Sequence, residues 1–191
     1  EDDDDDDDDM ENNLSLAAME AELKPQVLET FDEIADAYKK LRKLQDARVE
    51  NRQDAKDISD SDEKKYKDAS HTIVESVKSL SLNNNRIEAL VEQLYDINKQ
   101  LVGNEGRLLR LAESYGVKRA EFLTEYQGSE LDTAWSERVA ALSGKGWAKF
   151  ANDGAGDIDY LRGEISTLAT ETGLDIPEFR RIVHTVQKGE R

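Results

Sequence analysis

The chain has 191 residues, with 43 acidic and 26 basic side chains and a formal net charge of −17. Its length allows one domain, alone or with a tail, and the charge disfavours bulk attraction to nucleic acid or an anionic membrane. The absence of cysteine excludes disulfides, thiol nucleophiles and thiolate metal sites. Because no signal peptide or long apolar run is found, we expect a soluble, cytoplasmic protein.

Most of the negative charge lies at the start of the chain. Residues 1–24 contain 12 acids and one base, Lys24, and therefore hold −11 of the −17. Repulsion within the carboxylate run at residues 1–9 predicts a disordered tract over 1–24. A solvated linker is the favoured interpretation, and imitation of a phosphate backbone is the alternative. The chain begins within this tract and stops at Arg191 in charged, helix-like sequence, so we expect a fragment of a longer protein.

Helical periodicity continues after the acidic tract. Pro25 is typical of a first helical turn, and apolar residues then line one face as far as Leu41. The polar stretch 54–65 is predicted to be a loop. A second helix follows, with apolar residues at Tyr66, Ala69, Ile73, Val77 and Leu80.

A dense basic cluster lies on the first of these helices. The cluster comprises Lys39, Lys40, Arg42 and Lys43, which are candidates for contacting phosphate or a partner. The favoured interpretation is a solvated face with intrahelical ion pairs, such as Asp36 with Lys40 at i,i+4.

The longest uninterrupted helical pattern runs from Asn83 to Tyr115. Its apolar stripe is formed by Ile87, Leu90, Val91, Leu94, Ile97, Leu101, Val102, Leu108, Leu109, Ala112 and Tyr115. The asparagines at 83–85 offer an N-cap, and Gly116 a C′ stop. This helix is expected to be the spine of the fold. Gly103 and Gly106 lie inside it, and a bend or a close approach by another helix are the two interpretations of them.

The remainder of the chain predicts shorter helices separated by glycines. They cover residues 117–126, 131–142, 147–150, 157–172 and 176–186. Trp135 and Trp147 are expected to be buried core residues. We therefore predict an all-α fold, a multi-helix domain over 25–191 built on long antiparallel helices with short C-terminal helices.

No catalytic, cofactor-binding or metal site is predicted. The two histidines are far apart, His71 lacks a second ligand at metal spacing, and no carboxylate pair is fixed on one face. The Gly-Lys-Gly turn at 144–146 lacks the other residues of a nucleotide-binding loop. The chain is therefore expected not to be an enzyme and to need no cofactor.

Three groups of residues resemble a known family. They are a C-terminal motif (Glu171 to Leu174, Ile176, Glu178, Arg181, Ile182, Gly189, Glu190), a tryptophan-bearing stretch (Asp132, Thr133, Trp135, Trp147), and two pairs in the spine (Leu90-Val91, Arg110-Leu111). Together with the acidic tract, they resemble the non-conserved insert of the bacterial primary sigma factor, in the sigma-70 family. In that family, the C-terminal motif runs into the domain that binds the −10 promoter element.

The resemblance implies a part of the transcription initiation machinery. It implies an insert that packs on the −10 promoter-binding domain, contacts the large catalytic subunit of RNA polymerase, and affects promoter escape or the docking of regulators, including an activator. Promoter DNA would be bound through domains of the parent protein that lie outside this sequence. The alternative hypothesis is a free-standing, coiled-coil-like adaptor or scaffold that oligomerises through the spine.

Overall fold

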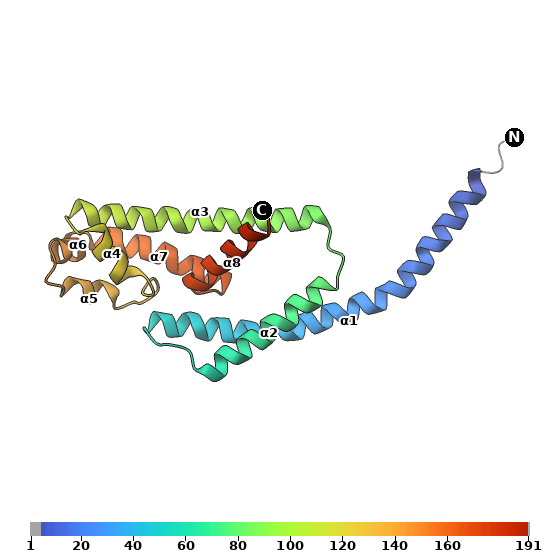
Figure 1. The fold of residues 1–191 in the computed structure, drawn as a ribbon, viewed down its shortest axis with the longest axis horizontal. Helices are drawn as coiled ribbons and strands as arrows, with labels where there is room; N and C mark the ends of the chain where they lie inside the picture. Colours follow the sequence, from blue (N-terminus) through green and yellow to red (C-terminus); the bar gives the residue numbers. More distant parts are fainter. Residues whose placement is uncertain (1–4, 191) are drawn as a thin grey trace. The chain divides into compact units, whose positions relative to one another are not determined.

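The structure is a computed structural model that describes residues 5–190, with side chains from Ser15 onward. All regular secondary structure in these residues is helical, which confirms the predicted all-α fold (Figure 1). The helices are α1 (Asp5–Gln53), α2 (Asp60–Lys78), α3 (Asn84–Ser114), α4 (Arg119–Tyr126), α5 (Trp135–Ala140), α6 (Trp147–Asp153), α7 (Ala155–Thr172) and α8 (Ile176–Gly189).

The described residues form two compact units, and each unit contains part of α1. Unit 1 consists of residues 1–41 and 65–81, and unit 2 of residues 42–64 and 82–191, as far as these are described. The expected division into a disordered tract at 1–24 and one domain at 25–191 stays a prediction. Residues 1–4 lie outside the described residues, and a helical backbone at 5–24 does not report mobility.

Unit 1 is an antiparallel pair formed by α1 and α2 (Figure 1). Few of its apolar side chains are buried, namely Ala37, Leu41 and Tyr66. The Ser76 hydroxyl on α2 donates to the Glu33 carboxylate on α1 at 2.9 Å. This contact places the C-terminal end of α2 next to Glu33 of α1.

In unit 2, α4, α6, α7 and α8 pack on α3, as expected of the predicted spine, and α5 packs on α6. Its N-terminus is capped by Asn83, whose side chain accepts from the backbone N–H of Asn85 at 2.9 Å. Gly116 follows the helix with φ of +93°, and the N–H of Val117 donates to the carbonyl of Ala112 at 3.1 Å. This is a Schellman ending, in which a positive φ favours glycine.

The core of unit 2 combines aliphatic side chains of α3, α7 and α8 with an aromatic cluster at one end of α3. Phe122, Trp135, Trp147 and Phe150 pack with ring centroids 6.0 to 6.4 Å apart. Trp135 has no exposed surface and Trp147 is 2% exposed, so the predicted burial of both is confirmed. The Trp135 indole N–H donates to the carbonyl of Glu125 at 2.9 Å, which satisfies its polar atom.

The Gly-Lys-Gly turn closes against the end of α3. Gly146 has φ of +89°, and a Cβ at this position would lie 2.5 Å from the carbonyl oxygen of Tyr115. Only glycine tolerates both the backbone angle and the close approach. The turn therefore has a packing role in setting α6 against α3.

The structure departs from the sequence predictions at Pro25 and at the start of α2. Pro25 lies inside α1 rather than in its first turn. Because residues 15–29 are all exposed, water can solvate the carbonyl of Ala21 that proline leaves without a donor. α2 begins at Asp60, inside the predicted loop, because the Ser59 hydroxyl accepts from the N–H of Asp62 at 3.2 Å and caps the helix.

The apolar stripe of α3 is also only partly buried. Ile87 and Leu90 are exposed, against expectation, because the helices of unit 2 cover α3 mainly from Leu94 onward. Val102 is also exposed, although it follows the buried Leu101. Neither Gly103 nor Gly106 interrupts α3, and no other helix approaches them within 4 Å of a Cβ position. The two glycines therefore do not mark a close approach by another helix.

Candidate functional site

The N-terminus of α8 is fixed by a buried carboxylate. Asp175 is 1% exposed, and its Oδ1 accepts from the backbone N–H of Glu178 at 2.9 Å, which makes it the N-cap. Its Oδ2 accepts from Nε of Arg48 at 3.1 Å and from Nε of Arg52 at 3.3 Å. Two guanidinium partners offset the desolvation of this carboxylate, so the C-terminal part of α1 and the start of α8 are held together.

A second set of charged contacts holds the middle of α8. Arg180 donates through Nη1 to Oε1 of Glu130 at 3.0 Å, and through Nη2 to Oε1 of Glu105 on α3. The hydroxyl of Tyr126 donates to the same Glu105 oxygen at 3.1 Å. The guanidinium thus connects α8 to α3 and to the segment that follows α4.

Burial affects the protonation of this second set. It raises the pKa of Glu105 above its ordinary value, although Arg180 and the Tyr126 hydroxyl act in the opposite direction. Burial and the nearby Glu105 and Glu130 carboxylates raise the pKa of Tyr126, so the phenol keeps its proton and remains a donor. These groups therefore serve to hold helices together.

Arg162 on α7 fixes the segment before α5. Its Nη2 donates to the carbonyls of Ser129 and Asp132 at 3.0 and 2.7 Å, and its guanidinium lies 4.5 Å from the Trp135 ring centroid. Burial lowers its pKa. A cation over an indole face is stabilising, particularly where water is excluded.

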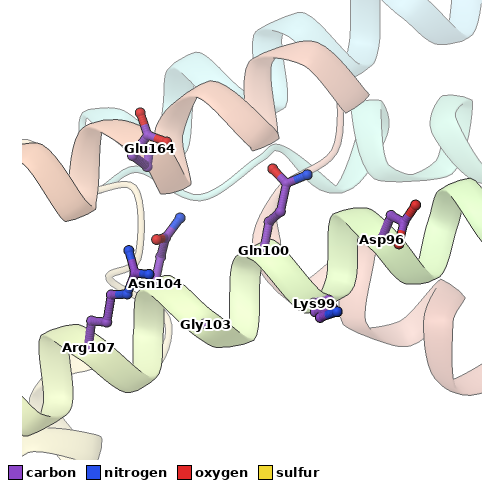
Figure 2. A pocket seen from close by; sticks show the side chains of 7 residues that line it. All are labelled: Asp96, Lys99, Gln100, Gly103, Asn104, Arg107 and Glu164. Carbon is purple, nitrogen blue, oxygen red and sulfur yellow. The ribbon is translucent and has the colours of Figure 1, made fainter.

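An open groove lies between α3 and α7, with a volume of about 470 Å³ (Figure 2). It is lined by Asp96, Lys99, Gln100, Gly103, Asn104, Arg107 and Glu164. Figure 2 shows the Gln100 and Asn104 amides extending from α3 on the side of α7, and the missing side chain of Gly103 leaves space between them. Two acids, two bases and two amides suit hydrogen bonding to a polar protein segment, and this groove is our candidate partner-binding surface.

The predicted basic cluster lies on α1, across the boundary between the units. Lys39 pairs with Asp36 at 3.3 Å, instead of the expected Asp36–Lys40 pair, and Arg42 pairs with Asp46 at 3.1 Å. Lys40 and Lys43 are exposed. Contact of Lys39, Lys40, Arg42 and Lys43 with phosphate or a partner stays a prediction.

The charged residues that hold α8 were not predicted from the sequence. A local signal existed for Asp175, since Asp-Ile-Pro-Glu is typical of an N-cap followed by Pro and Glu in the first turn. No such signal marked Glu105, Glu130 or Arg180, because their contacts join residues 50 and 75 positions apart.

The described residues thus form an all-helical module whose buried charges connect helices. Among them, no group of three His, Cys, Asp or Glu side chains is placed to hold a metal ion. No helix within the same residues is long and apolar enough to cross a membrane.

The sequence also matches a known family over most of its length. The family described as "Sigma-70, non-essential region" matches residues 1–169, and the chain belongs to it. The predicted relationship to sigma-70 factors is confirmed. Sigma-70 factors act in transcription initiation as partners of RNA polymerase and are not enzymes. The match ends within α7, so α8 lies beyond it.

Proposed function

We propose that this chain is the insert domain of a primary sigma factor, and that it packs on the −10 promoter-binding domain and contacts the large catalytic subunit of RNA polymerase or a regulator. Family membership supports a role in transcription initiation. The resemblance of residues 171–190 to the end of the insert supports the position next to the promoter-binding domain.

The observation that carries this proposal is the fastening of α8. Asp175 holds the start of α8 to α1, Arg180 holds its middle to α3, and Glu190 just after it accepts from the Tyr95 hydroxyl on α3. With α8 fixed at three points to the rest of unit 2, a domain that packs beside α8, as we propose for the −10 promoter-binding domain, would keep a set orientation relative to the module. The groove between α3 and α7 then faces a defined direction and suits contact with a polymerase subunit.

Photo-crosslinking in the holoenzyme tests the proposal. A crosslinking amino acid at Gln100, in the groove, is expected to capture the large catalytic subunit of RNA polymerase. The same amino acid at Tyr160, which is exposed on α7 outside the groove, is the control and should capture it far less. Equal capture from both positions, or none from Gln100, would show that the groove is not the contact surface.

The alternative is an oligomerising scaffold, which the exposed Ile87 and Leu90 on the predicted spine favour. Static light scattering separates the two functions. A monomer at micromolar concentration is expected for the insert. A dimer that Leu90→Ser dissociates would support the scaffold instead.

A further inference from the structure

An apolar stripe runs along one side of α1 and is buried at only one end. Successive members at Leu16, Met19, Leu23, Val27, Phe31, Ile34, Ala37 and Leu41 are three or four residues apart, so they share one face of the helix. Ala37 and Leu41 are buried, whereas Leu16 is 59% exposed and Leu23 is 55% exposed. The same face is therefore covered at its C-terminal end and uncovered over residues 16–31.

The helix α2 accounts for the covered end. Ser76 lies against Glu33, and α2 ends at Lys78, two residues further on. Residues 16–31 of α1 extend beyond this point by roughly 22 Å, at about 1.5 Å per residue. A second helix of about four turns would continue the packing that α2 begins.

The charges beside the uncovered stripe favour a basic occupant. Residues 16–36 contain six acids (Glu20, Glu22, Glu29, Asp32, Glu33, Asp36) and one base, Lys24. Pairing with a second copy would bring these acids together, because an antiparallel pair centred on Val27 sets Glu22 opposite Asp32. The part of α2 that belongs to unit 1, residues 65–78, carries three lysines and two acids. This segment is therefore weakly basic, whereas α2 as a whole, with four lysines and five acids, is not.

We propose that residues 16–31 of α1 form a docking surface for a basic amphipathic helix of another protein. Its apolar side would cover Leu16, Leu23 and Phe31, and its Lys or Arg side chains would pair with the flanking acids. Like-charge repulsion disfavours an anionic membrane or a second copy as the occupant. The inference deepens the proposed function by naming the kind of segment that a polymerase subunit or regulator presents. It rests on the proposed function for the identity of the protein that supplies the basic helix.

Binding of synthetic helices to the full 191-residue chain tests the docking surface. Three labelled 18-residue peptides are compared by fluorescence anisotropy: one has a leucine stripe flanked by lysines, one has the same composition in scrambled order, and one has glutamates in place of the lysines. The first is expected to bind at least about tenfold more tightly than either of the others. The scrambled peptide controls for simple attraction to the acidic tract, because its charge is the same.

Variants of the chain locate the binding. Leu23→Ser combined with Phe31→Ser should weaken binding of the striped lysine peptide by about tenfold or more, whereas Leu90→Ser, an equally exposed change on α3, should leave it unchanged. Glu22→Lys, Glu29→Lys and Asp32→Lys together should shift the preference toward the glutamate peptide. All these side chains are exposed, so circular dichroism should show an unchanged fold.

Three results would overturn the inference. They are equal binding of the striped and scrambled peptides, insensitivity to the Leu23 and Phe31 changes, and a dimer of the chain that Leu23→Ser dissociates. The crosslinking in the holoenzyme gives an independent reading. Peptide binding without crosslinking from Gln100 contradicts the proposed polymerase contact alone, and crosslinking without peptide binding contradicts the docking surface alone.

Discussion

The two compact units bury very different amounts of apolar surface. In unit 2, a core of Leu, Ile, Val and aromatic side chains joins α3 to α8 and the C-terminal part of α1, and Trp135, Val139, Phe150 and Ile165 have no exposed surface. In unit 1, α1 and α2 bury Ala37, Leu41 and Tyr66, while six large hydrophobic side chains between Leu16 and Phe31 remain exposed. Apolar residues recur at helical spacing in α1 as well as in α3, so this spacing alone does not determine how much apolar surface a helix buries.

The difference shows what a helix needs beyond an amphipathic pattern. A helix gains most of its stability from packing of its apolar face, and a two-helix pair offers one neighbour where a bundle offers several. Unit 2 is therefore expected to be the more stable unit. Unit 1 is expected to gain the most order when a partner binds.

Amide exchange should show the largest difference between the units. Core amides of α7, around Ile165, should exchange at least about a thousandfold more slowly than those at residues 15–31, because they exchange only through global opening. Residues 1–24 are expected to be unprotected, in line with their charge, and folded structure to begin near Pro25. Exchange detected by mass spectrometry measures both, and protection over residues 1–9 or equal protection in the two units would contradict the comparison.

Truncation of a buried tryptophan should weaken unit 2 strongly. Trp135→Ala is expected to lower the free energy of unfolding by about 3–5 kcal/mol, because it leaves a large cavity and an unpartnered carbonyl at Glu125. Urea unfolding followed by the fluorescence of Trp147 measures this. The matched control is Tyr160→Ala on α7, whose side chain is exposed, with an expected change within about 0.5 kcal/mol.

Loss of the Arg180 side chain should have an intermediate effect. Arg180→Ala is expected to cost about 2 kcal/mol, because Glu130, with 3% of its side chain exposed, is left without this guanidinium. The control is Lys118→Ala, which removes an exposed i,i+3 pair with Glu121 and should cost less than about 0.5 kcal/mol. Equal costs in urea unfolding would mean that α8 is not held by Arg180.

A substitution in the groove should stabilise the chain slightly. Gly103→Ala is expected to raise the free energy of unfolding by up to about 1 kcal/mol, because alanine favours the helix and no atom lies within 4 Å of the new Cβ. Thermal unfolding measures it, with Gly146→Ala as the contrasting change, which should destabilise. A lower midpoint for Gly103→Ala would show that α3 needs glycine there.

The last expectation is the absence of a measurable effect, because this chain should not bind duplex DNA. No shift of duplex DNA is expected at about 150 mM salt, because Lys39 and Arg42 pair with acids and the acidic tract opposes approach. A gel shift at that salt, lost when Lys39, Lys40, Arg42 and Lys43 are changed to Ala, would show instead that the cluster is a DNA-binding face.

Most helix positions could be predicted because their signals are local. Asn83, Gly116 and Gly173 mark helix ends in the sequence and in the structure, and the spacing of Ile158, Leu161, Ile165 and Leu168 identified the buried face of α7. Caps and periodicity act within about one or two turns, so a single sequence contains them.

The candidate site was less predictable because its contacts are distant in sequence. Nothing near Glu105 indicates Arg180, and nothing near Arg48 indicates Asp175. The exposure of Ile87 and Leu90 could not be predicted either, because it depends on where neighbouring helices end. The groove arises from the same cause, since Gly103 and Glu164 line one space only when α3 and α7 pack.

Pro25 has a mechanical consequence for α1. It lies nine positions after Leu16, and at about 100° per residue this sets it on the side of the helix opposite the apolar stripe. The pyrrolidine ring removes a hydrogen bond and pushes the preceding carbonyl away, which lengthens the side that carries it. A bend caused by Pro25 is therefore expected to bring the stripe to the inner side of α1, where a concave face would follow a second helix more closely than a straight rod would.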